Sequence, residues 1–115
     1  MTHLTTHVLD AASGDPAAGV RVVLAAASGD AVIAEATGAV LAHGTTDDGG
    51  RLSIGPERLA PGDYSLTFLT GEYFAARGAE TFYPSATVVF TVADRAHYHV
   101  PLLLSPFGYS TYRGS

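Results

Sequence analysis

The sequence predicts an all-β protein, a two-sheet β-sandwich of about eight strands with one short helix. Apolar and polar side chains alternate in several short runs, which is the pattern of half-buried antiparallel strands. Turn-forming residues separate these runs at regular intervals, and only one segment has a helical pattern. The 115 residues, of which 47% are apolar and 15% charged, suffice for a single domain, residues 1–115, with its own core.

The strands are predicted where alternation, or a short apolar run, is bounded by turn residues. In chain order we expect them at Leu4 to Leu9, Val20 to Leu24, Ala39 to His43, Arg51 to Ile54, Tyr64 to Leu69, Ala86 to Val92, His97 to Leu104 and Phe107 to Tyr112. Alternation is clearest from Tyr64 to Leu69 and from Ala86 to Val92. Their buried faces would consist of Tyr64, Leu66 and Phe68, and of Ala86, Val88, Phe90 and Val92.

Turns and one helix connect the strands. Residues that favour turn dihedrals gather at Ser13 to Pro16, Ser28 to Asp30, Asp47 to Gly50 and Ala60 to Asp63. The helix is predicted from Gly71 to Gly78, because helix-forming residues fill its middle. Glycine follows Arg77, as is common just after a helix C-terminus.

Composition excludes several classes of function. The chain has no cysteine and no lysine, so it can form no disulfide, thiolate nucleophile or Schiff base. Its net charge of −5 and its six scattered arginines argue against binding to nucleic acid. No run approaches the roughly 20 apolar residues of a membrane helix. The N-terminus lacks the basic and apolar regions of a secretory signal, so we expect a cytoplasmic protein.

The segment around His97 and His99 is the most informative part of the sequence. On a strand, the two imidazoles would share the outer face with Pro101 and Leu103, while the residues between them face the core. Proline restricts such a strand to an edge, a bulge or a place where the missing N–H does no harm. An outer face that is part apolar and part imidazole favours a ligand or partner. Two alternatives stay open: incidental surface histidines, and a metal site, which would need further ligands.

Two single residues and the chain end complete the set of candidates. Alternation places His7 away from the core, and Arg51 opens a strand after a turn; taken singly, each is typical of a solvated surface. The chain end is unusual, because aromatic and β-forming residues continue to Tyr112 where a terminus would normally be polar. A final strand there would hold Arg113 and the α-carboxylate of Ser115 in a fixed place.

Taken together, these segments resemble the 5-hydroxyisourate hydrolases, the transthyretin-related enzyme family. The resemblance runs from His7 to the last residue. It rests on Thr6-His-Val-Leu-Asp10, the turn from Thr46 to Arg51, Thr81-Phe-Tyr-Pro84, His97-Tyr-His-Val-Pro-Leu-Leu-Leu-Ser-Pro106 and Tyr112-Arg-Gly-Ser115. The last two segments distinguish the hydrolases from transthyretin, the hormone carrier of the same fold. The resemblance therefore implies a transthyretin-like sandwich.

The resemblance also implies an active site without metal or cofactor. The family's catalytic positions fall on His7, Arg51, His99 and Ser115, and its substrate-binding positions on Tyr112, Arg113 and Gly114. His97 would be peripheral, while His3 and His43 match no functional position and are expected to face solvent. One departure is Gly49, which stands where the family usually has aspartate in the turn before Arg51.

The implied reaction is hydrolysis of the lactam N1–C6 bond of 5-hydroxyisourate to 2-oxo-4-hydroxy-4-carboxy-5-ureidoimidazoline, a step of urate breakdown. Histidine suits activation of water and protonation of the leaving nitrogen near neutral pH, and arginine suits an anionic ring or the developing oxyanion. The division of roles between His7 and His99 stays open. The family further implies a homotetramer, with sites where the outer faces of the last two strands of different subunits meet. The alternatives are a transthyretin-like small-molecule carrier without catalysis and a sandwich that only mediates protein contacts.

Overall fold

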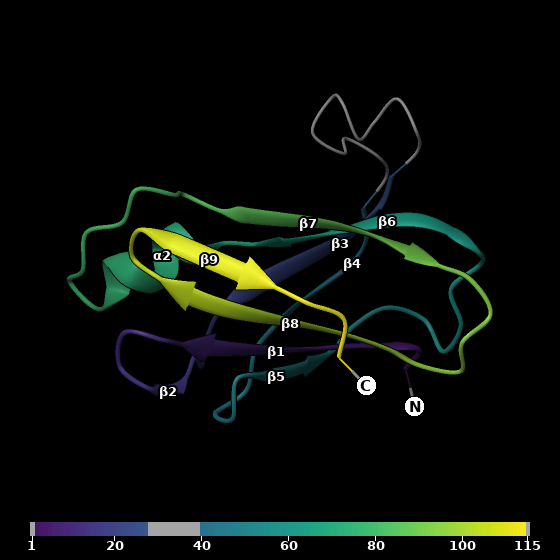
Figure 1. The fold of residues 1–115 in the computed structure, drawn as a ribbon, viewed down its shortest axis with the longest axis horizontal. Coiled ribbons are helices and arrows are strands. Elements are labelled where there is room, and N and C mark those ends of the chain that lie inside the picture. Colours follow the sequence, from purple (N-terminus) through teal and green to yellow (C-terminus); the bar gives the residue numbers. More distant parts are fainter. Residues whose placement is uncertain (1, 28–39, 115) are drawn as a thin grey trace.

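The computed structural model describes residues 2–27 and 40–114, which form two β-sheets packed face to face (Figure 1). One sheet has the order β2-β1-β8-β9, with β5 also paired to β1, and the other has the order β4-β3-β6-β7. Helix α2 (Thr70–Ala76) follows β6 at one end of the sandwich. The strands are β1 (Leu4–Asp10), β2 (Asp15–Pro16), β3 (Arg21–Ala27), β4 (Val40–Thr45), β5 (Arg51–Ser53), β6 (Gly62–Phe68), β7 (Ala86–Val92), β8 (Tyr98–Ser105) and β9 (Gly108–Thr111).

The β-sandwich predicted from the sequence is confirmed, and most strands lie within a few residues of their predicted ends. Strand β7 begins and ends where alternation places it, and β6 begins two residues earlier than expected, at Gly62. Asp15 and Pro16, predicted as part of a turn, instead form the two-residue strand β2, which pairs with the end of β1. The predicted turn from Ser28 to Asp30 and the first residue of the predicted strand, Ala39, lie outside the described residues.

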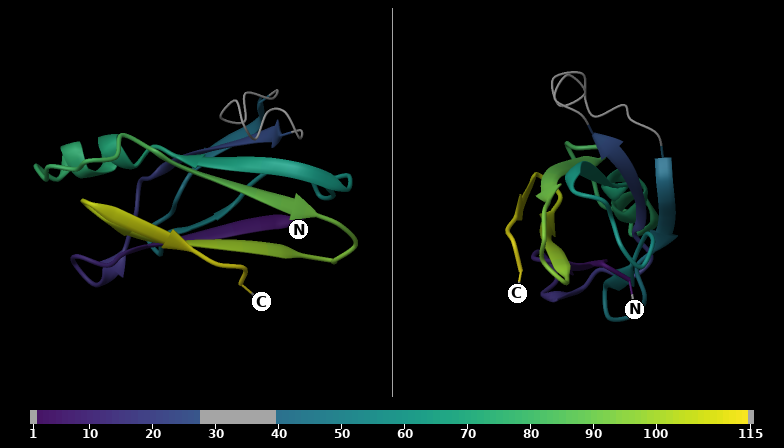
Figure 2. Two further views of the ribbon diagram at one scale, coloured as in Figure 1. Left: turned by 45° about the horizontal axis from the view of Figure 1, so that its top comes forward. Right: turned by 90° about the vertical axis from the view of Figure 1, so that its right-hand side faces the viewer.

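The core lies between the two sheets, which face each other in the end-on view of Figure 2. It is built from the side chains that alternation turns inward on each strand. On β6 and β7 these are the predicted ones, although Val88 and Phe90 are only partly buried. The largest fully buried side chains are Leu4 on β1, Leu24 on β3, Leu66 and Phe68 on β6, and Leu102 and Leu104 on β8.

Helix α2 is tied to the opposite sheet by a buried hydrogen bond. The Tyr73 hydroxyl donates to Oδ2 of Asp10 at 2.9 Å, and Oδ1 of Asp10 accepts from the backbone N–H groups of Ala12 and Ser13. Burial, together with the bond to Asp10, raises the pKa of Tyr73 to about 12. Gly78 follows the helix with φ of +67°, as predicted for a residue that ends a helix. Among the residues described, no helix has the length and apolar character needed to cross a membrane.

His3 is buried, so the prediction that it faces solvent was wrong. Its Nδ1 accepts the backbone N–H of Leu59 at 3.0 Å, and its Nε2 therefore donates to the carbonyl of Arg95 at 2.7 Å. The ring also packs edge-on against Tyr98. His3 precedes β1, where the loops before β6 and β8 close over it, and its two ring nitrogens satisfy backbone groups of both loops.

Strand β8 is central rather than at an edge, since it pairs in parallel with β1 and antiparallel with β9. Its proline is tolerated because pairing with β9 begins only at Leu102. The carbonyl and the nitrogen of Pro101 both point toward the C-terminal strand, where the Thr111 hydroxyl donates to that carbonyl at 2.7 Å. Pro101 is already buried within the single chain and Leu103 is half-buried. The outer face of β8 is therefore less exposed in the single chain than alternation predicts.

Candidate active site

The outer face of the five-stranded sheet brings together residues from three strands. His7 on β1 lies directly opposite Arg51 on β5, and Thr5 on β1 lies opposite His99 on β8. Residues paired in register project to the same side of a sheet. The side chains of His7, Arg51 and His99 thus share one surface although they are far apart in the sequence.

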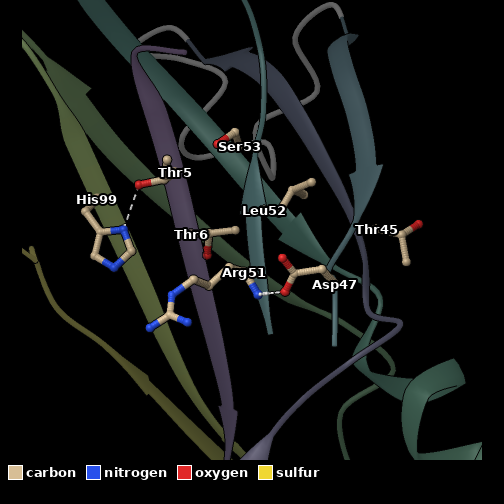
Figure 3. A pocket seen from close by; sticks show the side chains of 8 residues that line it. All are labelled: Thr5, Thr6, Thr45, Asp47, Arg51, Leu52, Ser53 and His99. Atoms are coloured by element: carbon tan, nitrogen blue, oxygen red, sulfur yellow. Dashed lines mark hydrogen bonds between the residues drawn. The ribbon is translucent and has the colours of Figure 1, made fainter. Parts of the chain in front are cut away.

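An open cavity of about 520 Å³ lies on this surface (Figure 3). The Arg51 side chain extends across β1 toward the strand that carries His99. His7 is not part of the lining and lies beside it, two residues beyond Thr5 on β1. The cavity offers a small polar ligand both a guanidinium and an imidazole. Its lining is Thr5, Thr6, Thr45, Asp47, Arg51, Leu52, Ser53 and His99.

The loop before Arg51 is held by the side chain of Asp47. Its Oδ1 accepts the backbone N–H groups of Gly49 and Arg51, both at 2.9 Å. Gly50 has φ of +74°, and a Cβ there would collide with the carbonyl oxygen of Val8. The loop is therefore fixed by Asp47 and Gly50, and it does not depend on the side chain at position 49.

The Gly49 carbonyl sets the tautomer of His7. Nε2 of His7 lies 2.9 Å from that oxygen, and because a carbonyl only accepts, Nε2 carries the proton. In the neutral ring Nδ1 then keeps its lone pair. The acceptor is the backbone carbonyl of residue 49. Glycine in place of the family's usual aspartate therefore keeps this hydrogen bond to His7.

His99 is half-buried and its pKa is lowered. Burial is the main cause, and the electrostatic effects of His97, His7 and Arg51 lower the His99 pKa further. Nδ1 of His99 is hydrogen-bonded to Oγ1 of Thr5 at 2.8 Å, which leaves Nε2 for a ligand in the cavity. The neutral imidazole is thus favoured at neutral pH, and a neutral imidazole is the form that can accept a proton.

The C-terminal segment lies against the other side of His99. The Gly114 N–H donates to the His99 carbonyl at 2.9 Å, and a Cβ on Gly114 would collide with the His99 ring. Tyr112 and Arg113 are exposed and do not line the cavity of Arg51; with His99 they line a second one of about 250 Å³ between β7 and β8. Ser115 lies outside the described residues.

Sequence reasoning missed Thr5. Its hydroxyl contacts both His99 and the exposed His97, the latter at 2.9 Å. The signal was present, because alternation puts Thr5 on the same face as His7. His43 is exposed on β4 of the other sheet, as predicted. Within residues 2–27 and 40–114, no group of three or more His, Cys, Asp or Glu side chains is placed to hold a metal ion.

Comparison with known proteins identifies the family. Residues 4–114 match the model of the HIUase/Transthyretin family. A 5-hydroxyisourate hydrolase of Salmonella dublin is 45% identical over 115 residues, which cover 97% of this chain and 80% of the relative. The structure of Klebsiella pneumoniae 5-hydroxyisourate hydrolase superimposes with a TM-score of 0.83 at 38% identity, covering 100% of this chain and 94% of the other.

A carrier shares the same architecture. Sea bream transthyretin, solved in complex with thyroxine, has a TM-score of 0.84 at 31% identity, over 97% of this chain and 94% of its own. The fold alone therefore does not separate hydrolase from carrier. The match over almost the whole length and the identities above leave no doubt about descent: this chain belongs to the HIUase/Transthyretin family.

Proposed function

We propose that this protein hydrolyses 5-hydroxyisourate in urate breakdown, opening the six-membered ring at the N1–C6 bond. One observation carries the proposal: an imidazole that favours its neutral form and a guanidinium meet on one open polar cavity. The relatives at about 45% identity over nearly the full chain are hydrolases of this substrate. The Arg51 cavity is also lined mainly by polar residues, which suits an oxidised purine better than a large apolar ring.

His99 is the group best suited to activate water. Its neutral form is favoured, its Nδ1 is occupied by Thr5, and its Nε2 is free to take a proton from a water molecule. The hydroxide formed attacks the lactam carbonyl. The same Nε2–H then protonates the leaving ring nitrogen as the C–N bond breaks, and the carboxylic acid formed releases its remaining proton to water to give the carboxylate.

Arg51 in the cavity and His7 beside it assist the reaction. The guanidinium is always charged and presents several N–H donors, so it suits the developing oxyanion or an anionic ring. His7 lies in register with Arg51, and its Nε2–H is committed to the Gly49 carbonyl. Its Nδ1 can therefore accept a hydrogen bond from substrate or water and orient it. In this scheme Tyr112 and Arg113, which line the second cavity together with His99, and Ser115 position the substrate from the chain end.

We further propose that the active species is a homotetramer. Strands β7 and β9 each end the order of their sheet, so their outer backbone groups can pair with another copy. Exposed apolar and aromatic side chains gather on and near these strands: Phe82, Val89, Phe107, Tyr109 and Tyr112. Such a surface favours association with further copies of the chain.

The test is a direct assay. Urate oxidase generates 5-hydroxyisourate from urate, and its ultraviolet absorbance is followed with and without this protein. We expect much faster decay with the protein, and a loss of about 10²–10⁴-fold in rate for His99→Ala or His7→Ala. His43→Ala, an exposed histidine on the other sheet, serves as the matched control and should keep full activity. Decay at the uncatalysed rate with wild-type protein, together with binding of an aromatic ligand, would favour the carrier instead.

A further inference from the structure

The Thr5 hydroxyl lies between two imidazoles. Its Oγ1 is 2.8 Å from Nδ1 of His99 and 2.9 Å from Nε2 of His97. Thr5 is half-buried on β1, whereas His97 is exposed in the loop that precedes β8. The three side chains therefore form a continuous line of hydrogen bonds from the wall of the cavity to solvent.

The loop that carries His97 is firmly anchored, although its side chain is exposed. The Tyr98 hydroxyl oxygen accepts the N–H groups of Ala93 and Arg95, at 2.7 and 3.3 Å. The Tyr98 N–H donates to the carbonyl of His3 at 2.8 Å, and the buried His3 ring holds the carbonyl of Arg95. These bonds fix both ends of the loop, so the contact between His97 and Thr5 is built into the fold.

A hydroxyl has one proton, and this couples the two rings. If Thr5 donates to His97, it accepts Nδ1–H of His99, and Nε2 of His99 has a free lone pair. If Thr5 donates to His99, it accepts Nε2–H of His97, and Nε2 of His99 carries a proton. The first arrangement makes His99 a base toward the cavity, and the second makes it an acid.

We propose that Thr5 and His97 form a proton relay that switches His99 between its base and acid tautomers during the reaction. This inference rests on the hydrolase function proposed above. Thr5 and His97 act through His99 and do not contact the reacting atoms, so they are relay and positioning residues. His97, predicted to be peripheral, is the outer end of the relay.

The proton movements balance. Water gives a proton to Nε2 of His99 as its oxygen bonds to the lactam carbon; the Nδ1 proton passes to Thr5, and the Thr5 proton passes to Nε2 of His97. His99 is then neutral with its proton at Nε2. The leaving nitrogen takes that proton as the C–N bond breaks, and Nδ1 of His99 regains a proton from Thr5 in the same movement, so the ring stays neutral. The proton on His97 thus returns through Thr5 to Nδ1 of His99, and the starting state is restored.

The surrounding charges favour moving the positive charge outward. A doubly protonated His99 would be half-buried among other cationic groups, whereas His97 is exposed to water. Transfer through Thr5 places the charge where it is best solvated. The titratable and charged groups that line the two cavities with His99 or act on its pKa are His7, Arg51, Asp47, His97, Tyr98, Tyr112 and Arg113.

The first test needs no substrate. Long-range ¹H–¹⁵N correlation spectra of histidine-labelled protein report the tautomer of each ring, with His99 assigned through its own variant. We expect the Nδ1–H form of His99 in the wild type and in Thr5→Ser, which keeps the hydroxyl, and a shift toward the Nε2–H form in Thr5→Val. The same His99 tautomer in wild type and Thr5→Val would overturn the coupling.

The second test is kinetic. Thr5→Val and His97→Gln should each lower kcat about 10–100-fold with little change in KM, because general acid–base assistance is impaired while binding is not. Thr5→Ser should retain most of the rate. His43→Gln, at an exposed histidine on β4 of the other sheet, is the matched control and should behave like the wild type. A wild-type kcat in His97→Gln would overturn the relay.

The two tests separate this inference from the proposed function. If wild-type protein hydrolyses 5-hydroxyisourate but Thr5→Val is equally fast, the relay is wrong and the function stands. If wild-type protein has no hydrolase activity, the proposed function is wrong and the proton transfer is overturned with it. In that case the spectra would still show whether Thr5 couples the two imidazoles.

Discussion

At the scale of single residues, the site depends on how His99 is held. Its ring is fixed by the Thr5 hydroxyl, and its carbonyl accepts the N–H of Gly114. Burial and nearby cationic groups favour the uncharged ring. An imidazole held in this way needs little rearrangement before it accepts a proton, which is how a preorganised general base differs from a free histidine.

The lowered pKa of His99 predicts the acid limb of the pH–rate profile. A base is active in its unprotonated form, so kcat/KM should fall only when the pH drops below the His99 pKa. Because that pKa lies below the ordinary value of about 6.5, activity should persist at pH 6.5 and decline at more acidic pH. Rates measured from pH 5 to 8, with an NMR titration of His99 in the free protein, check this. An acid limb above pH 6.5 would contradict it.

Some site residues were within reach of the sequence and others were not. His7, Arg51 and His99 could be named because they occupy motifs of a known family. Thr5 was not named, because threonine is an ordinary residue on the polar face of a strand and its place on the face of His7 gives it no role by itself. His3 was placed wrongly because it precedes β1, where alternation no longer applies and loops from elsewhere cover the chain. The burial of His3 by these loops depends on tertiary contacts, which the alternation of residues along one strand does not predict.

At the scale of elements, the C-terminal segment acts as a support for β8. Gly114 lies so close to His99 that a Cβ would collide with the imidazole. We therefore predict that Gly114→Ala lowers kcat/KM about 10–100-fold by displacing the ring. The melting temperature should change little, because Gly114 lies outside the core cluster and next to exposed residues. Steady-state kinetics and thermal unfolding of the purified variant measure both.

A second glycine in the same region provides the control. Gly108 opens β9, and a Cβ there would meet only the Ser105 hydroxyl at an ordinary 3.7 Å. Gly108→Ala should therefore leave the rate unchanged. If Gly114→Ala were as active as Gly108→Ala, the packing of the tail on His99 would have no part in catalysis.

The elements themselves differed in how well the sequence predicted them. Strand β7 was predicted to the residue, because each alternate side chain has one clear environment. The pairing of β1 with β8 was not predicted, since parallel pairing joins segments more than 90 positions apart, as in Thr5 opposite His99. Local alternation gives each strand its faces, but it does not choose the neighbour. The site lies on the face that this long-range choice creates.

At the scale of the whole molecule, the sheet edges formed by β7 and β9 are available to another copy of the chain. Strands β7 and β9 each lie last in their sheet, and exposed side chains such as Val89 and Tyr109 lie on them. An edge strand with exposed apolar residues is a template for pairing, which natural proteins usually cover or block with charge. We expect further copies of the chain to cover these edge strands, because the chain is small and its cavities open at its surface.

We predict that the protein in solution has about four times the 11.9 kDa mass of one chain, measured by sedimentation equilibrium or light scattering at micromolar concentration. Val89→Lys places a charge on the outward side of β7 and should reduce the mass by at least half. Leu41→Lys, at an exposed site on β4 at the other edge of the same sheet, is the control and should keep the wild-type mass. Hydrolase activity should fall with the mass in Val89→Lys and stay unchanged in Leu41→Lys. A wild-type protein that sediments as a single chain while fully active would show that each copy completes its own site, and that the exposed edges serve no catalytic purpose.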